Sequence, residues 1–204
     1  MRRPSLPALL AALLLTAWGA GPLAADEFEA EKTARFEELE SRYADSPEQL
    51  ALAKAGWLSG RANAFGRQGE LDRAVDALEE AIDIRRDYFP AWLALALAHR
   101  AAERYDRAIE TIERAPHTMR YRGTELGGFE YDVYYVKMLV YRAIPDHQAG
   151  LKAAREGLAV LDDPQLEARR KEAEQAGVAE PGSGAAIVQL LQSYVGRLAP
   201  VGES

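Results

Sequence analysis

The chain contains no cysteine among its 204 residues. It can therefore form neither a disulfide nor a thiolate metal site, and it offers no cysteine nucleophile. Processing as a lipoprotein is excluded for the same reason. The absence leaves the cellular compartment open, because an exported protein need not carry disulfides.

The chain also lacks a basic surface signature. Its formal net charge is −7 at pH 7, and no run of like charge is long enough to form an interaction tail. A broad nucleic-acid-binding surface needs a basic stripe, which this charge balance disfavours. We therefore expect no nucleic-acid partner.

No residue pattern typical of catalysis is present. His99, His117 and His147 lie far apart in different predicted elements, and no HExxH pair is available to hold a metal. The glycine-rich segment 123–128 lacks the Gly-Lys-Ser/Thr ending that cradles a phosphate, so we interpret it as a loop. A Gly-x-Ser-x-Gly elbow is also missing. These absences predict a protein that is not an enzyme and has no metal, no cofactor and no small-molecule substrate.

What the chain does contain is a repeat. When the chain is laid on itself so that Gly69 falls on Glu103, small and large residues coincide at a period of about 34 residues. The apolar stripe of the first copy comprises Leu58, Ala62, Phe65, Ala74, Leu78, Ala81 and Ile82. The stripe of the second copy comprises Trp92, Ala96, His99, Ala108, Ile112 and Ala115. This spacing predicts two amphipathic helices in each copy, and it predicts that His99 is a packing residue.

The segments between the paired helices carry turn signals. Gly69 can take a positive φ at little cost and end the first helix of the first copy. Glu103 stands at the same place in the second copy, so the glycine is lost there. Pro116 ends the second helix of that copy, because proline cannot continue a helix.

This arrangement resembles the tetratricopeptide repeat family, in an exported bacterial form, over about half of the chain. The family pattern has aromatic and small residues in the first helix, a glycine at the turn, and small, large and small residues in the second helix. A third repeat follows if residues 123–130 are treated as an insertion. Its matching residues are Tyr134, Met138, Tyr141, Gly150, Ala154, Gly157 and Leu158, with departures from the pattern at Pro145 and Gly150.

The resemblance implies an all-α fold, a right-handed solenoid of helical hairpins with capping helices at both ends. About three repeats are expected, at residues 55–88, 89–122 and 131–164. Residues 26–54 are expected to form N-terminal capping helices, and residues 165–204 to form C-terminal capping helices and a tail.

Local patterns add detail to the capping segments. Ser46 is expected to cap the helix that starts at Pro47, with Gln49 completing a capping box. Residues 165–175 are heavily charged and are expected to form a surface cap. Residues 185–198 form an amphipathic helix, which either covers the last groove of the solenoid or docks on a partner.

Residues 1–25 have the features of a secretory signal peptide. A basic start precedes the apolar stretch from Leu6 to Ala20, and small residues lead to a cleavage site that we place after Ala25. We therefore expect export by the Sec route to the periplasm. The alternative is an uncleaved anchor in the inner membrane, since the stretch is about long enough to span a bilayer. Membrane contact is then limited to this segment.

The resemblance also implies a concave groove lined by the first helix of each repeat. In the family register, the groove positions also include Gly56, Ser59, Leu93 and Asp132, and the positions expected to bind a partner are Asn63, Arg67, Leu97, Arg100, Tyr135, Leu139 and Arg142. Asn63 matches an asparagine that some family members use to hold a peptide backbone or a C-terminal carboxylate, although its expected basic neighbour is Ser59 here. The three arginines either orient an acidic partner segment or pair with nearby acids such as Glu70 and Glu103.

The function implied by the resemblance is that of a non-catalytic, exported scaffold for protein–protein interaction, with a peptide or a partner protein held in the groove. The alternative is a structural or assembly subunit of a cell-envelope complex, docked through the insertion loop and the C-terminal helix.

Overall fold

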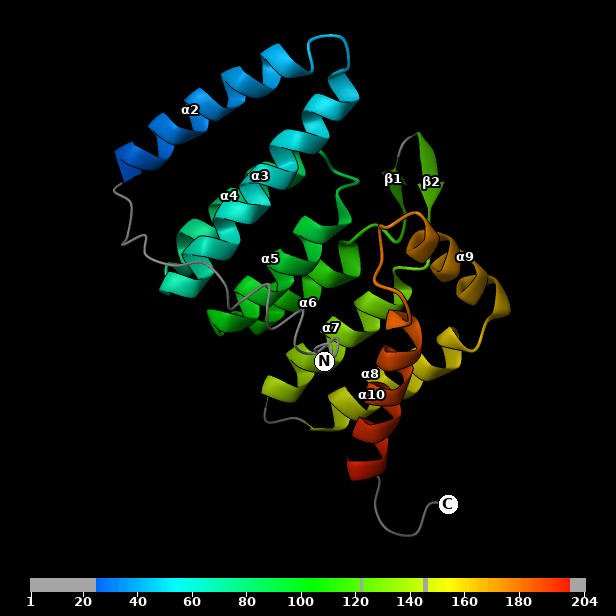
Figure 1. Ribbon diagram of the computed structural model, residues 1–204. Helices are drawn as coiled ribbons and strands as arrows, with labels where there is room; N and C mark the ends of the chain where they lie inside the picture. The colour runs from blue at the N-terminus through cyan, green and yellow to red at the C-terminus, as the bar shows by residue number, and fades with distance from the viewer. Residues whose placement is uncertain (1–24, 122, 145–146, 199–204) are drawn as a thin grey trace, which may run out of the picture. The chain divides into compact units, whose positions relative to one another are not determined.

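The computed structural model describes residues 25–121, 123–144 and 147–198 (Figure 1). These residues form nine α-helices and one two-stranded hairpin, so the predicted all-α helical-repeat fold is confirmed. None of the described helices is long and apolar enough to cross a bilayer. The predicted signal segment lies outside the described residues up to residue 24.

The chain divides into two compact units, one ending at Ala98 and the other beginning at His99. The division falls inside helix α5 (Phe89–Ala101). The repeat boundaries expected from the sequence remain predictions.

The first unit is built around the hairpin of α3 (Pro47–Gln68) and α4 (Leu71–Ile84), preceded by α2 (Ala25–Arg42). The apolar stripe predicted for the first repeat forms its core. The buried members are Ala55, Leu58, Ala62 and Phe65 from α3, and Ala74, Leu78 and Ala81 from α4. The alanines leave room for the two helices to pack closely, while the larger residues fill the space between them.

Gly69 closes this hairpin as the sequence predicts. Its φ is +80°, and the N–H groups of Gly69 and Glu70 donate to the carbonyl oxygens of Gly66 and Phe65 at 3.2 and 3.0 Å. Glu103 takes the same left-handed conformation in the second repeat, with a φ of +59°, although it is not a glycine.

The capping box predicted at the start of α3 does not form, so this prediction is wrong. Pro47 does stand in the first turn, but the Ser46 side chain makes no capping hydrogen bond. In a capping box, the Gln49 side chain would accept a hydrogen bond from the Ser46 N–H. That N–H instead donates to the Tyr43 carbonyl oxygen at 2.9 Å. A preceding turn therefore takes the donor that the box requires.

Aromatic rings hold α2 against α3. Phe28 stacks on Trp57 with ring centroids 5.9 Å apart and meets Phe65 edge-on at 5.1 Å. Phe36 meets Trp57 edge-on at 5.9 Å. Lys54 lies over the Phe36 ring, with Nζ 4.6 Å from its centroid. A helix with a polar sequence is thus anchored by a few large apolar contacts.

The second unit continues from the end of α5 with α6 (Tyr105–Arg114), a β-hairpin and four further helices. These helices are α7 (Glu130–Ala143), α8 (His147–Leu161), α9 (Pro164–Gln175) and α10 (Ser183–Leu198). The antiparallel α7 and α8 form the third helical hairpin, and α6 packs on α7.

Helix α10 covers this third hairpin. It packs on α8 and α7, and Figure 1 shows it, in orange to red, beside α8. Ile187, Leu191 and Tyr194 are buried, whereas Leu190 and Leu198 are half-buried. Of the two roles expected for this helix, the structure shows the covering one.

Gly150, a departure from the repeat pattern, has a packing reason. A Cβ at this position would lie 2.3 Å from the Tyr194 hydroxyl oxygen and 3.3 Å from the Tyr141 Cβ. A larger residue at this position would push on the Tyr194 side chain, so the glycine favours close packing of α10 on α8.

The insertion is not simply a loop, which corrects the expectation for residues 123–128. Strand β1 (Met119–Tyr121) pairs antiparallel with β2 (Thr124–Leu126), with Met119 opposite Leu126 and Tyr121 opposite Thr124. Met119 and Leu126 are buried at the base of the hairpin, while the residues toward its tip are more exposed. The apolar pair at the base gives the hairpin its register.

Candidate interaction surface

Three of the predicted groove residues lie in the first unit. Asn63 and Arg67 are one turn apart on α3, and Leu97 is on α5; all three are half-buried. Ser59, one turn before Asn63, is buried and its hydroxyl has no hydrogen-bond partner among the described residues. It therefore offers no charge that would complete a carboxylate clamp with Asn63.

The other four lie in the second unit, and the structure brings three of them together. Tyr135, Leu139 and Arg142 follow one another along one face of α7, from buried through half-buried to exposed. Burial raises the pKa of the Tyr135 hydroxyl, and the positive charges of Arg100 and Arg142 partly oppose that rise. Both guanidinium groups are thus near enough to act electrostatically on the same hydroxyl.

The three groove arginines do not pair with the acids named as the alternative. Within the described part of the chain, Arg67, Arg100 and Arg142 make no ion pair. Glu70 pairs with Arg73 instead, at the start of α4. Each of the three stands in the last turn of its helix, where the helix dipole favours a cation.

Asp132 is one of the predicted groove positions, but the structure gives it a different role. It is bonded to Arg170 of α9, whose side chain is 5% exposed. Arg170 also donates from Nε to the Ser183 hydroxyl at 3.0 Å and from Nη1 to the Gly128 carbonyl oxygen at 3.4 Å. Asp132 therefore helps to join α7 to α9 and α10 and is not free to bind a partner.

Arg170 is the residue that sequence reasoning missed. Its helix has the charged composition of a solvated cap, and most of that helix is indeed exposed. Its partners come from segments far away in the sequence, so no local pattern could indicate them. The prediction of a mere surface cap at residues 165–175 is wrong for this side chain.

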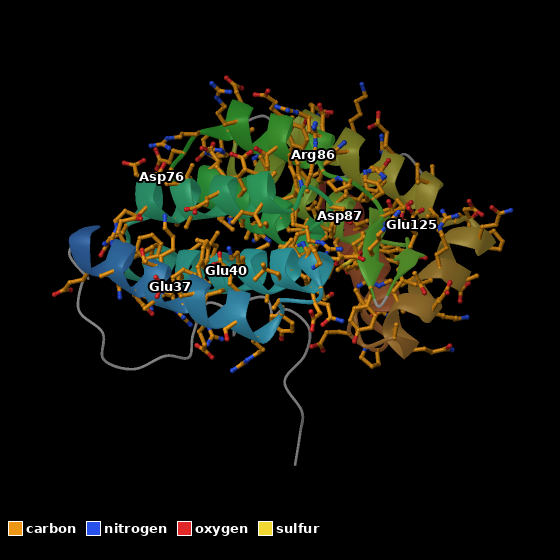
Figure 2. All side chains as sticks on the ribbon, turned by 90° about the horizontal axis from the view of Figure 1, so that it is seen from above. Glu37, Glu40, Asp76, Arg86, Asp87 and Glu125 are labelled. Carbon is orange, nitrogen blue, oxygen red and sulfur yellow. The ribbon has the colours of Figure 1, made fainter. Side chains whose placement is uncertain are left out.

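The adjacent acids Glu79 and Glu80 of α4 differ in exposure. Glu79 is exposed, whereas Glu80 accepts a hydrogen bond from Lys32 of α2 at 3.1 Å. Figure 2 shows two more acids of this unit, Glu37 on α2 and Asp76 on α4, among its surface side chains. Helices α2 and α4 of the first unit thus carry exposed acidic side chains.

The histidines do not form a site. His99 is 6% exposed, as expected of a packing residue, while His117 and His147 are exposed. Burial lowers the pKa of His99, the positive charges of Arg104 and Arg107 lower it further, and Glu110 partly opposes them. In the part of the chain that the structure describes, no group of three or more His, Asp or Glu side chains is placed to hold a metal ion.

Comparison with known proteins agrees with the helical hairpins. Residues 67–120 match the family model described as Tetratricopeptide repeat, a segment that runs from the end of α3 into β1. Neither the curated proteins nor the solved structures yield a match. Tetratricopeptide repeats generally mediate protein–protein interaction. The match and the paired helices together support a tetratricopeptide-repeat protein.

Proposed function

We propose that this protein is an exported, non-catalytic scaffold that binds a peptide or a partner protein in a concave groove of its repeats. The observation that carries the proposal is that Arg67, Arg100 and Arg142, at equivalent places at the ends of three helices, make no ion pair with another residue that the structure describes. A planar guanidinium without a counter-ion can donate two parallel hydrogen bonds to a carboxylate.

Apolar residues complete the proposed binding surface. Leu97, Leu139 and Tyr135 supply apolar contact area, which helix-in-groove recognition uses to anchor a partner, and tyrosine is enriched among the residues that carry most binding energy. Asn63 adds an amide beside Arg67 that can bond a peptide backbone. In this proposal the arginines orient the partner and the apolar residues hold it.

Export is the second part of the proposal. The basic start, apolar stretch and small residues before Ala25 support cleavage by signal peptidase and release into the periplasm. The test is the N-terminal sequence of the protein recovered from a periplasmic fraction. A chain that begins at Asp26 supports export, whereas a full-length chain in the inner membrane fraction supports an uncleaved anchor.

The groove is tested by a pull-down from envelope extract. Wild-type protein is compared with a variant in which Arg67, Arg100 and Arg142 are all changed to alanine. Arg86→Ala is the matched control, because Arg86 is exposed, unpaired among the described residues and outside the predicted groove. We expect the triple variant to lose its partner and the control to keep it. Recovery of the same partner by the triple variant would remove the groove from the proposal.

A second candidate is an assembly subunit that docks through the hairpin. The favouring observation is that the hairpin projects exposed residues, including Arg120 and Glu125, from a base held against α9. Helix α10 contributes less to this candidate, because its apolar face is already buried. Replacing residues 119–126 by a short Gly-Ser linker separates the two: loss of the complex with the linker, but not with the arginine variant, favours docking through the hairpin.

A further inference from the structure

Helix α2 is held on the α3–α4 hairpin by side chains at a few positions. It lies along α3, and Figure 1 shows it in blue. Among its residues 27–42, Phe28 and Leu39 are buried, and the others are half-buried or exposed. Phe28 and Phe36 make its ring contacts with α3. An element that buries so little apolar surface opens at a lower free energy than the core of its unit.

Ion pairs of both senses cross between α2 and the hairpin. They join Glu31 to Arg61 at 3.1 Å, Lys32 to Glu80 at 3.1 Å, and Glu40 to Lys54 at 2.6 Å. The hairpin therefore fits a helix with this charge order beside two aromatic anchors. A second copy of α2 carries the same charges and rings at the same spacing, so it meets every one of these contacts.

Pairs within α2 support the helix when it leaves the hairpin. Lys32 pairs with Glu29 at 2.8 Å, and Arg42 pairs with Glu38 at 2.7 Å, one turn apart in each case. Such pairs add to the stability of an isolated helix. Helix α2 therefore keeps a helical preference of its own, which lowers the cost of docking it on another surface.

The turn between α2 and α3 is suited to extension. It is closed by the Ser46 N–H, which donates to the Tyr43 carbonyl oxygen at 2.9 Å, and the Ser46 side chain adds no cap. Ser46 has a φ of −142° and a ψ of 84°, and the following Pro47 disfavours a helical conformation there. Helix α10 begins differently, because the Ser183 hydroxyl is bonded to the buried Arg170. Release is therefore easier for α2 than for α10.

We propose that α2 exchanges between two copies of this chain, giving a symmetric dimer in which each α2 covers the α3–α4 hairpin of the other copy. The contacts of α2 are then made between chains, so the turn and the cost of association separate the two forms. A short tether holds its own helix at an effective concentration on the order of mM, so the dimer grows toward that concentration. The exchange does not depend on what the groove binds.

Crosslinking between two differently tagged forms of the mature protein tests the exchange. One form carries Glu40→Cys on α2 and the other carries Lys54→Cys on α3, and each thiol is unique because the chain has no cysteine. The forms are incubated together at about 1 mM, then diluted about a hundredfold just before a short bis-maleimide linker is added. We expect about a tenth or more of the chains to become covalent heterodimer.

The matched control measures crosslinking by random collision. It pairs the Glu40→Cys form with a Lys152→Cys form, whose thiol stands on the exposed face of α8. We expect its heterodimer to be about tenfold or more below that of the first pair, because exchange brings α2 to α3 and not to this position.

A lock on α2 assigns the dimer to this helix. A chain with both Glu40→Cys and Lys54→Cys is crosslinked within itself at high dilution, so that α2 cannot leave. It is expected to form no dimer in light scattering after incubation at about 1 mM. The same chain with its thiols capped by N-ethylmaleimide is the control, and it is expected to dimerise as the wild type does.

A shortened turn gives a reference dimer. Deleting Ala44 and Asp45 leaves too little chain for α2 to fold back on its own α3, so this variant is expected to be mainly dimeric. Circular dichroism shows whether it remains helical. If it does not fold, the locked and capped chains still decide the matter.

Each outcome supports or overturns the exchange. A heterodimer above the Lys152→Cys control that is lost in the locked chain supports it. A heterodimer no more abundant than that control overturns it, and so does a folded, shortened variant that stays monomeric. Equal dimerisation of the locked and capped chains also overturns it, because association then uses another surface.

Discussion

Glu103 holds the same left-handed backbone conformation in the second repeat that Gly69 holds in the first, with φ values of +59° and +80°. Both turns are closed by the same pair of hydrogen bonds: the N–H groups of Glu103 and Arg104 donate to the carbonyl oxygens of Arg100 and His99 at 3.0 and 2.8 Å. The turn geometry is thus kept where the glycine is lost, at the cost of placing a Cβ in a region that L-residues avoid.

Replacing Glu103 with glycine is expected to stabilise the protein. Removing the strain of an L-residue in the left-handed conformation stabilises the fold by about 1 kcal/mol. The greater conformational entropy of glycine in the unfolded chain offsets part of this gain. Urea unfolding followed by circular dichroism measures the difference. Glu103→Ala is the control, because it removes the charge and keeps the Cβ, so no such gain is expected. Equal stability of the glycine and alanine variants contradicts a strained turn.

The buried Arg170 is expected to be essential to the second unit. Changing Arg170 to alanine leaves the Asp132 carboxylate, which is 16% exposed, without its counter-ion, and breaking a largely buried pair in this way costs about 3 kcal/mol or more. Arg169→Ala is the control, since Arg169 is 42% exposed and its ion pair with Glu130 spans 3.6 Å. Such a pair contributes less than about 1 kcal/mol. Similar losses in the two variants, measured by urea unfolding, would show that burial of Arg170 does not matter.

The close approach of α10 to α8 predicts a rescue. Gly150→Ala puts a methyl group onto the Tyr194 hydroxyl, and overpacking of this kind costs about 1–3 kcal/mol. Tyr194→Phe removes the hydroxyl, which is buried without a partner among the described residues. The double variant Gly150→Ala/Tyr194→Phe is therefore expected to recover much of the lost stability. Additive losses in thermal unfolding of the two variants exclude this contact as the cause.

Stability is expected to fall in mild acid because of His99. Its folded-state pKa lies below the unfolded value, so the neutral ring is favoured in the fold and protonation favours unfolding. The contribution is present above the unfolded pKa of about 6.5 and is lost as the pH falls through and below that value. The charged groups that act on it are Arg104, Arg107 and Glu110.

His99→Phe restores the aromatic residue of the repeat pattern and removes the titration. The drop in stability between pH 7.5 and pH 5 is expected to be smaller in this variant than in wild type. His117→Gln is the control, because His117 is exposed and the drop should be unchanged. The measurement is urea unfolding at both pH values. An identical pH dependence in wild type and His99→Phe assigns the effect to other groups.

The fold was largely predictable because its signal is periodic. Leu58, Ala62 and Phe65 recur at helical spacing and are buried together, so pattern and packing agree. The β-hairpin was missed because three-residue strands are too short to show alternation. The Asp132–Arg170 pair was missed because its members come from α7 and α9, and sequence spacing carries no information about such contacts.

The groove positions remain a prediction, and the ion pairing of their arginines could not be predicted from the sequence. Arg67 and Arg73 are equally far from Glu70 in the sequence, so either could pair with it. The chain breaks its helix at Gly69, which separates Arg67 from Glu70, whereas Arg73 shares the first turn of α4 with that acid. Arg67 therefore lacks this ion pair for two reasons. The turn at Gly69 separates it from Glu70, which the repeat pattern predicts, and the Glu70 side chain pairs with Arg73, which the pattern does not predict.

The most direct measurement of partner binding is site-specific photo-crosslinking in the native host. A photoreactive phenylalanine analogue is placed at Leu139, between Tyr135 and Arg142, and in a second strain at Glu79 on the exposed face of α4. We predict that Leu139 captures a discrete protein partner, that the crosslinked segment carries a carboxylate, and that Glu79 captures none. Capture at Glu79 with none at Leu139 would contradict binding in the groove.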